Sequence, residues 1–76
     1  NSRIYILILQ KETLTIEGKS IKQIVIYNTT GQIVKKIDCN EDVININIEE
    51  FTAGIYLLNI TDEKGYIVTK KISITK

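Results

Sequence analysis

VININI, residues 43–48, alternates isoleucine at positions 44, 46 and 48 with asparagine at positions 45 and 47. Successive side chains of a β-strand point to opposite faces, so this pattern predicts a strand with one buried face and one solvated face. Seventeen of the 76 residues are isoleucine, whose β-branched side chain fits pleated, half-buried strands. Composition and alternation together indicate an all-β protein.

Six other segments carry strand patterns: residues 4–9, 13–17, 24–27, 33–37, 54–61 and a last one from 66 or 67 to about 75. Turn residues separate them at intervals typical of sandwich folds. The sequence therefore predicts an immunoglobulin-like β-sandwich of about seven strands. A length of 76 residues allows one domain, whose core must be dense in apolar side chains.

Three parts of the sequence give specific expectations about strands and turns. Residues 4–9 are apolar without interruption and are expected to form a strand covered on both faces. Residues 13–17 should pair with them as a hairpin, and Gly18 is expected to end that second strand. The polar residues 40–42 are expected to form a turn between two strands.

Period-2 alternation also predicts which side chains point into the core. The segment 33–37 leaves two alternatives open, because either Ile33 and Ile37 or Val34 can face inward. The side chains expected to be largely buried are Leu14, Ile16, Ile24, Ile26, Ile44, Ile46, Tyr56, Leu58, Ile60, Ile72 and Ile74.

Five residues have the chemistry of structural motifs. Asn28 can bond the backbone two residues on, and Gly31 supplies the positive φ that a turn needs. Gly54 and Gly65 are expected to be turn residues at the starts of the last two strands. Tyr56 follows an apolar residue and a glycine, which resembles the tyrosine corner of sandwich domains, where the hydroxyl bonds to upstream backbone.

Several function classes find no support in the residues. The formal net charge is +1 and charges of both signs are interspersed, which argues against a nucleic-acid partner. The chain has no histidine, and its single cysteine, Cys39, excludes an internal disulfide and has no nucleophile setting. Paired acids such as residues 41–42 and 49–50 are expected to be solvated surface. No catalytic residue, cofactor or metal ligand is predicted.

Four motifs occur in a fixed order: LTIEG at residues 14–18, IYNTTGQIV at 26–34, FTAGIYLLNI at 51–60 and ISITK at 72–76. Jointly they resemble the C-terminal sorting domain of proteins exported by the type IX secretion system of Bacteroidota. Many members open with Tyr-Pro-Asn-Pro, whereas this chain has no proline and supplies a strand at residues 3–9 instead. In this it is similar to the subtype found behind secreted cysteine proteinases such as gingipains.

The resemblance implies an address tag rather than an enzyme. Residues 1–76 would be the C-terminal domain of a larger secreted protein whose N-terminal cargo domain is exported through the periplasm to the outer-membrane surface or beyond. The implied partners are the type IX translocon with its shuttle components and a sortase-like signal peptidase that removes the domain. The recognition residues would lie in the last strand and the tail after it: Thr69, Lys71, Ile72, Ile74 and Lys76.

Two alternatives remain open at this point. The domain could be a non-catalytic accessory or adhesin sandwich that packs against a neighbouring domain, with its last-strand lysines, such as Lys71, serving only as edge protection. Residues 3–9 also form a flat apolar strand, through which two copies could pair at an open edge or swap strands to give a homodimer.

Overall fold

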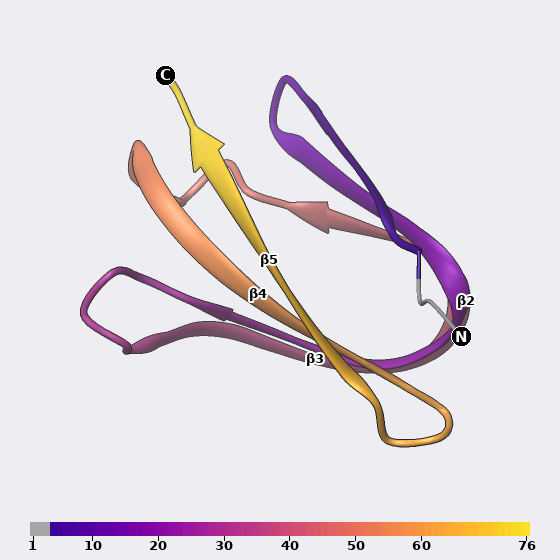
Figure 1. The fold of residues 1–76 in the computed structure, drawn as a ribbon. Coiled ribbons are helices and arrows are strands. Elements are labelled where there is room, and N and C mark those ends of the chain that lie inside the picture. The colour runs from indigo at the N-terminus through magenta and orange to yellow at the C-terminus, as the bar shows by residue number, and fades with distance from the viewer. Residues whose placement is uncertain (1–3) are drawn as a thin grey trace.

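The computed structural model describes residues 4–76, which form five strands and no helix (Figure 1). The strands are β1 (Ile6–Gln10), β2 (Thr13–Tyr27), β3 (Ile33–Asn47), β4 (Gly54–Asp62) and β5 (Ile67–Ile74). All neighbouring strands are antiparallel. The prediction of an all-β fold is confirmed, with a strand count slightly below the expected seven because two of the strands are long.

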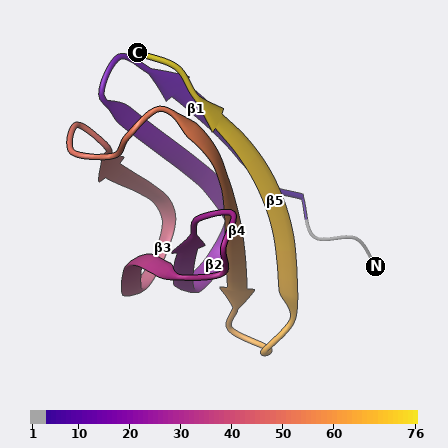
Figure 2. The same cartoon turned by 90° about the vertical axis from the view of Figure 1, so that its left-hand side faces the viewer.

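The strand β2 organises the whole fold, because it pairs with three of the other four strands. Its first half pairs with β1, its second half pairs with β4, and β3 accompanies both halves. The strand β5 then joins the far side of β4. Since β2 and β3 run through both layers, one hydrogen-bonded sheet folds over itself into a sandwich (Figures 1 and 2).

A bulge lets β2 pass from one layer to the other. Between the pairs Glu17↔Val43 and Ile21↔Glu41, β2 advances from residue 17 to 21 while β3 moves only from 43 to 41. Ser20 takes a φ of 55° there, and its amide donates to Asp42 Oδ1 at 2.8 Å. Extra residues on one strand increase the local twist and bend it. The expected strand end at Gly18 and the expected turn at residues 40–42 are therefore wrong, since both lie inside continuous strands.

Gly18 has a packing role at this bend. A Cβ at position 18 would lie 2.3 and 2.5 Å from two ring carbons of Tyr5, closer than any real contact. Tyr5 is buried, and its ring occupies the space that a side chain at Gly18 would need. Glycine within a strand often marks such a close approach.

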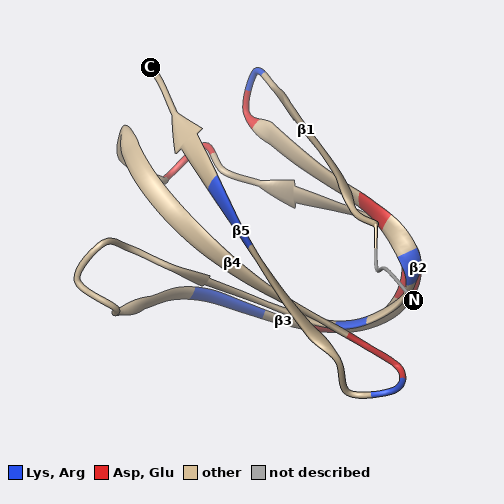
Figure 3. Cartoon of the chain, in the orientation of Figure 1, with Lys and Arg blue, Asp and Glu red and all other residues tan. Residues whose placement is uncertain are grey.

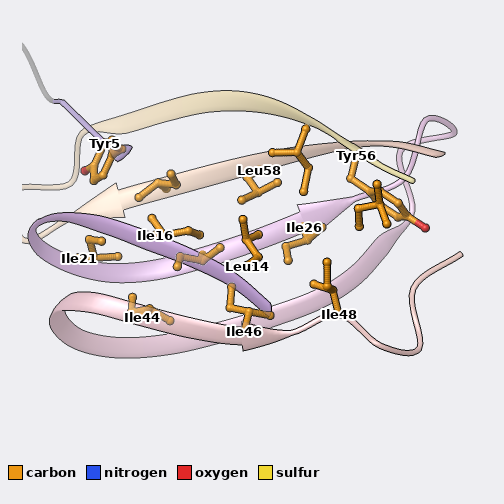
Figure 4. Packing of buried hydrophobic residues seen from close by; sticks show 14 residues of the cluster. Tyr5, Leu14, Ile16, Ile21, Ile26, Ile44, Ile46, Ile48, Tyr56 and Leu58 are labelled. Atoms are coloured by element: carbon orange, nitrogen blue, oxygen red, sulfur yellow. The ribbon is translucent and has the colours of Figure 1, made fainter. Parts of the chain in front are cut away.

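The core lies between the two layers and is almost entirely aliphatic (Figure 4). Charged residues of both signs are dispersed along the strands and turns (Figure 3). Every side chain predicted to point inward is buried, and Tyr5, Ile21 and Ile48 join them. Full burial of one such side chain contributes about 1.5–3 kcal/mol. For residues 33–37, where the sequence left two alternatives, Ile37 packs against the core, whereas Ile33 and Val34 are both exposed.

The strand β1 is less covered than the sequence predicted. Ile4, Ile6 and Ile8 are 73%, 52% and 42% exposed, so one face of this segment is open. The other face is covered at Tyr5 and partly at Leu7, whereas Leu9 is 41% exposed. The reason is topological: β1 is an edge strand that pairs with β2 alone, and no other layer lies over its outer face in the part of the chain that the structure describes. A run of apolar residues therefore does not indicate a strand buried on both faces here.

The connection between β2 and β3 is built around Asn28. Asn28 Oδ1 accepts from the amides of Thr30 and Gln32, each at 3.0 Å. The Asn28 carbonyl accepts from the Gly31 amide, and the Asn28 amide donates to the Gln32 carbonyl, again at 3.0 Å. Gly31 has a φ of +88°, which a residue with a Cβ rarely adopts.

The connection between β4 and β5 repeats this pattern around Asp62. Asp62 Oδ1 accepts from the amides of Lys64 at 2.9 Å and Tyr66 at 3.0 Å. The Asp62 carbonyl accepts from the Gly65 amide, the Asp62 amide donates to the Tyr66 carbonyl, and Gly65 also has a φ of +88°. The two loops are thus the same turn, with a side-chain oxygen at its first residue and glycine three residues later.

Substitution of Gly18 tests the packing at the bend. Gly18→Ala should lower the free energy of unfolding by about 1–3 kcal/mol, because the new methyl group meets the Tyr5 ring and overpacks the site. Urea titration followed by circular dichroism measures the loss, with exposed Lys19→Ala as the control. In a Tyr5→Leu background the Gly18→Ala penalty should shrink. An equal penalty in both backgrounds would contradict the proposed contact.

Substitution of Asp62 tests the turn before β5. Asp62→Ala removes the acceptor of two backbone amides and should cost about 1–3 kcal/mol of unfolding free energy. Asp62→Asn keeps an oxygen at that position, as Asn28 does in the matching turn, and should cost less than half as much. Chemical denaturation of both variants makes the comparison. Equal losses would show that the side-chain oxygen does not stabilise the turn.

Candidate functional site

The residues expected to take part in recognition divide into two sets on β5. Ile72 and Ile74 are 7% and 4% exposed and point into the core opposite Tyr56 and Gly54 of β4. Thr69 and Lys71 point to the outer face and are exposed. Of these four residues, Thr69 and Lys71 offer the exposed side chains, whereas Ile72 and Ile74 pack into the core and hold the backbone of β5 in place.

The outer face around Lys71 mixes apolar and polar groups. Lys71 lies opposite Leu57 of β4, which is itself 38% exposed, and Leu57 lies opposite Tyr27 of β2. One row along, the Thr69 hydroxyl donates to Asn59 Oδ1 at 2.8 Å. The hydrogen bond to Asn59 fixes the Thr69 side chain. The Lys71 ammonium is the charged group of the neighbouring row, which it shares with Leu57 and Tyr27.

Lys76 makes contacts within the domain. Its Nζ donates to the Glu49 carbonyl at 2.5 Å and to the Ile48 carbonyl at 3.3 Å. These two carbonyls belong to the connection between β3 and β4, so the ammonium ties the segment after β5 to a distant loop. A partner that bound the Lys76 ammonium, as its expected recognition role requires, would compete with these two carbonyls.

Tyr56 and Gly54 lie where the chain enters β4. The Tyr56 hydroxyl donates to the Thr52 carbonyl at 2.7 Å and lies 3.0 Å from Thr52 Oγ1. The Tyr56 ring packs against Phe51 with ring centroids 5.3 Å apart and the planes tilted by 54°. Gly54 has a φ of +151°. The bond to backbone four residues upstream is the geometry of a tyrosine corner, and it gives Tyr56 a structural position.

A groove of about 370 Å³ separates β1 from β5. The sequence does not predict this groove, because its two walls are about 60 residues apart in the chain and share no local pattern. The only sequence signal was indirect: both segments are apolar and lack proline, as open edge strands can. The groove is lined by Tyr5, Leu7, Leu9, Lys70, Lys71 and Ile72.

Cys39 lies near the bend of the sandwich and is partly buried. Its thiol donates to the Ile21 carbonyl at 3.4 Å. Burial raises the pKa of the Cys39 thiol, and the neighbouring Asp38 and Glu41 carboxylates raise it further. A thiol with a raised pKa is a poor nucleophile at neutral pH, so its surroundings favour a packing role.

The described residues lack two further kinds of feature. Residues 4–76 contain no group of three or more histidine, cysteine or acidic side chains placed to hold a metal ion. Over the same residues, no helix has the length and apolarity needed to cross a membrane.

Solved structures and curated proteins supply comparisons for the whole domain. A DUF3244 family protein from Bacteroides vulgatus, with an immunoglobulin-like β-sandwich fold, superposes with a TM-score of 0.81 over 93% of this chain and 84% of its own. Its sequence identity is 22%, so the likeness shows the fold, and it confirms the immunoglobulin-like class.

Sequence comparison gives a curated relative and a family. Beta-agarase A from Zobellia galactanivorans is 32% identical over 47 residues, which is 62% of this chain but only 9% of that protein. The model of the secretion system C-terminal sorting domain matches residues 4–75, nearly the whole chain. The chain therefore belongs to the family of type IX secretion system C-terminal sorting domains.

Proposed function

We propose that this domain is the sorting signal of a larger secreted protein and acts as a folded module. The observation that carries the proposal is the extent of the family match, which spans residues 4–75 and so includes all five strands rather than a short peptide. Residues 1–76 form its C-terminal domain, and an N-terminal cargo domain is what it delivers to the cell surface or the extracellular space. The domain is a substrate of the export machinery and not an enzyme.

Recognition is proposed to occur at the translocon of the outer membrane and its shuttle components. Thr69 and Lys71 are the side chains that meet the partner, because they are exposed on an edge strand. Ile72 and Ile74 act indirectly, since their burial fixes the β5 backbone against β4. A sortase-like peptidase is then proposed to remove the domain from the cargo.

The class of cargo protein is less restricted than the resemblance to gingipain-like proteinase tails implied. The tails of gingipain-like proteinases gain no support from the relative described above, which is an agarase. That relative is a long protein in which the matching segment is a small part. We therefore propose a secreted cargo protein of unspecified activity in front of this domain.

An export assay tests the proposal. A fluorescent protein with a general secretion leader and this chain at its C-terminus should reach the surface or medium of a Bacteroidota strain that has type IX secretion. Deletion of the chain should leave the fluorescent protein folded and stable in the periplasm. Export without the domain would refute the sorting role.

A charge reversal in the same assay tests the recognition residue. Lys71→Glu should change stability by less than about 0.5 kcal/mol, because the side chain is exposed, yet should reduce export. Lys36→Glu is the matched control, since it makes the same change at an exposed position of β3. Lys76→Glu is a poorer test because it also breaks the bonds to Ile48 and Glu49. Normal export of the folded Lys71→Glu protein would place the signal elsewhere on the domain.

The second candidate is an accessory sandwich domain that packs against a neighbour. The observation in its favour is the exposed apolar outer side of the β1 segment, formed by Ile4, Ile6 and Ile8. Under this alternative, deletion of the domain would destabilise the cargo. Under the sorting proposal, the cargo remains stable and is not exported.

The same apolar side and the open edge of β1 predict self-association through pairing or swapping of that strand. Light scattering at rising protein concentration should show a dimer, and Ile6→Lys should shift the equilibrium toward monomer. A protein that stays monomeric at high concentration, with no change on Ile6→Lys substitution, would exclude the dimer.

A further inference from the structure

The groove between β1 and β5 lies between two strand edges that no other described strand occupies. The strand β1 pairs only with β2, and β5 pairs only with β4. Figure 2 shows β1 and β5 as neighbours that run toward the same end of the molecule. Edge strands present backbone donors and acceptors that an added strand can use. The groove therefore combines an apolar surface with backbone groups suited to an extended peptide.

The two walls of the groove differ in chemistry. The β1 wall is formed by Tyr5, Leu7 and Leu9 and carries no charge. The β5 wall carries two adjacent lysines, Lys70 and Lys71, and no acidic residue lines the groove. This local excess of positive charge stands out in a chain whose net charge is only +1.

The two lysines lie on opposite sides of the β5 edge. Lys70 pairs with Leu58, whose side chain is buried, so Lys70 begins on the inner side and is only partly exposed. Lys71 pairs with Leu57 on the outer face and is exposed. A strand added at this edge would alternate its own side chains between the same two sides, so a segment that alternates apolar and acidic residues can place its carboxylates beside Lys71 and its apolar side chains on the inner side.

We propose that this groove binds an extended segment of alternating apolar and acidic residues, which adds as a further strand at the β5 edge. Backbone pairing gives the affinity. The apolar side chains, all on the inner side, contact Leu7, Leu9 and Ile72, and the carboxylates, all on the outer side, contact Lys71. The role of this groove in sorting rests on the function proposed above. The binding of an alternating apolar and acidic segment to the groove does not rest on that function.

Lysines at an edge also discourage unwanted pairing, and this effect makes the site selective. The strand β1 of a second copy spans Ile6–Gln10 and has no acidic residue to match the ammonium groups. An acidic strand gains the attraction that a neutral strand lacks and a basic strand would meet repulsion. The lysines thus disfavour basic strands and favour acidic ones.

The strand β3 provides a matched comparison within the same molecule. It also pairs with β2 alone and carries an adjacent lysine pair, Lys35 and Lys36, both exposed. A second groove, which includes Lys35, is lined by Glu49 and Glu50 as well, so its charges offset each other. The proposal therefore predicts acidic-strand binding at β5 and not at β3.

The first experiment uses the 76-residue chain and a short synthetic peptide that alternates valine and glutamate. Amide NMR spectra should show saturable shifts confined to β1 and β5, and amides of the β5 edge should exchange more slowly with solvent. The same peptide with lysine in place of glutamate should bind at least about tenfold more weakly. A peptide with N-methylated alternate amides should lose binding, because it cannot pair along an edge.

The second experiment reverses the charge of the site. The double variant Lys70→Glu and Lys71→Glu should bind the glutamate peptide about tenfold more weakly and should gain affinity for the lysine peptide. The double variant Lys35→Glu and Lys36→Glu should behave as the unmodified chain. Circular dichroism and urea unfolding verify the fold of each variant, and Lys71→Glu alone serves if the double variant is destabilised.

Several results would overturn the proposal. These are equal binding of the glutamate and lysine peptides, binding that survives N-methylation, shifts outside β1 and β5, or equal losses in the two double variants. Retained binding after N-methylation would mean that the lysines act only as a general anion contact. Failure of peptide binding alongside normal domain-dependent export would refute this site and leave the sorting function standing. Peptide binding without domain-dependent export would refute the sorting function and leave this site standing.

Discussion

The fold depends on one constraint: β2 must belong to both layers of the sandwich without a break in the chain. Its first half pairs with β1 and its second half with β4, so the strand has to bend sharply while Ile16 and Ile21, on either side of the bend, both stay buried. The bulge around Ser20 provides the bend, and the missing side chain of Gly18 provides the space into which Tyr5 packs. This short region therefore sets how the two layers lie relative to each other.

Much of the core was predictable from the sequence, because alternation at period 2 depends only on local geometry. Ile44, Ile46 and Ile48 point inward as their spacing requires. The number of strands was not predictable in the same way. Glycine and polar residues mark both turns and bulges, so Gly18 and residues 40–42 gave the signal of a chain reversal although the strands continue. A bulge and a turn differ in what lies across the sheet, which local sequence does not contain.

The candidate site was only partly predictable for a related reason. The exposure of Thr69 and Lys71 is what alternation along β5 predicts, whereas the groove requires the relative position of two strands at opposite ends of the chain. The bonds of Lys76 to the Ile48 and Glu49 carbonyls are equally non-local. A folded recognition surface has one thermodynamic advantage over a flexible tag. Its side chains and backbone are already ordered, so the binding partner does not have to supply the free energy of ordering them.

The separation of β1 and β5 along the chain also makes the groove an indicator of completed folding. No hydrogen-bonded ladder joins these two strands, so their spacing is set by every ladder between them, through β2 and β4. Of the five strands, β5 is the last to leave the ribosome, and its two buried isoleucines, Ile72 and Ile74, can be buried only when the earlier strands have formed the layer that receives them. A chain that is half-folded, or in which β2 has not bent, has no such groove. A receptor that binds there would distinguish a finished domain from an unfinished one without inspecting anything else in the molecule.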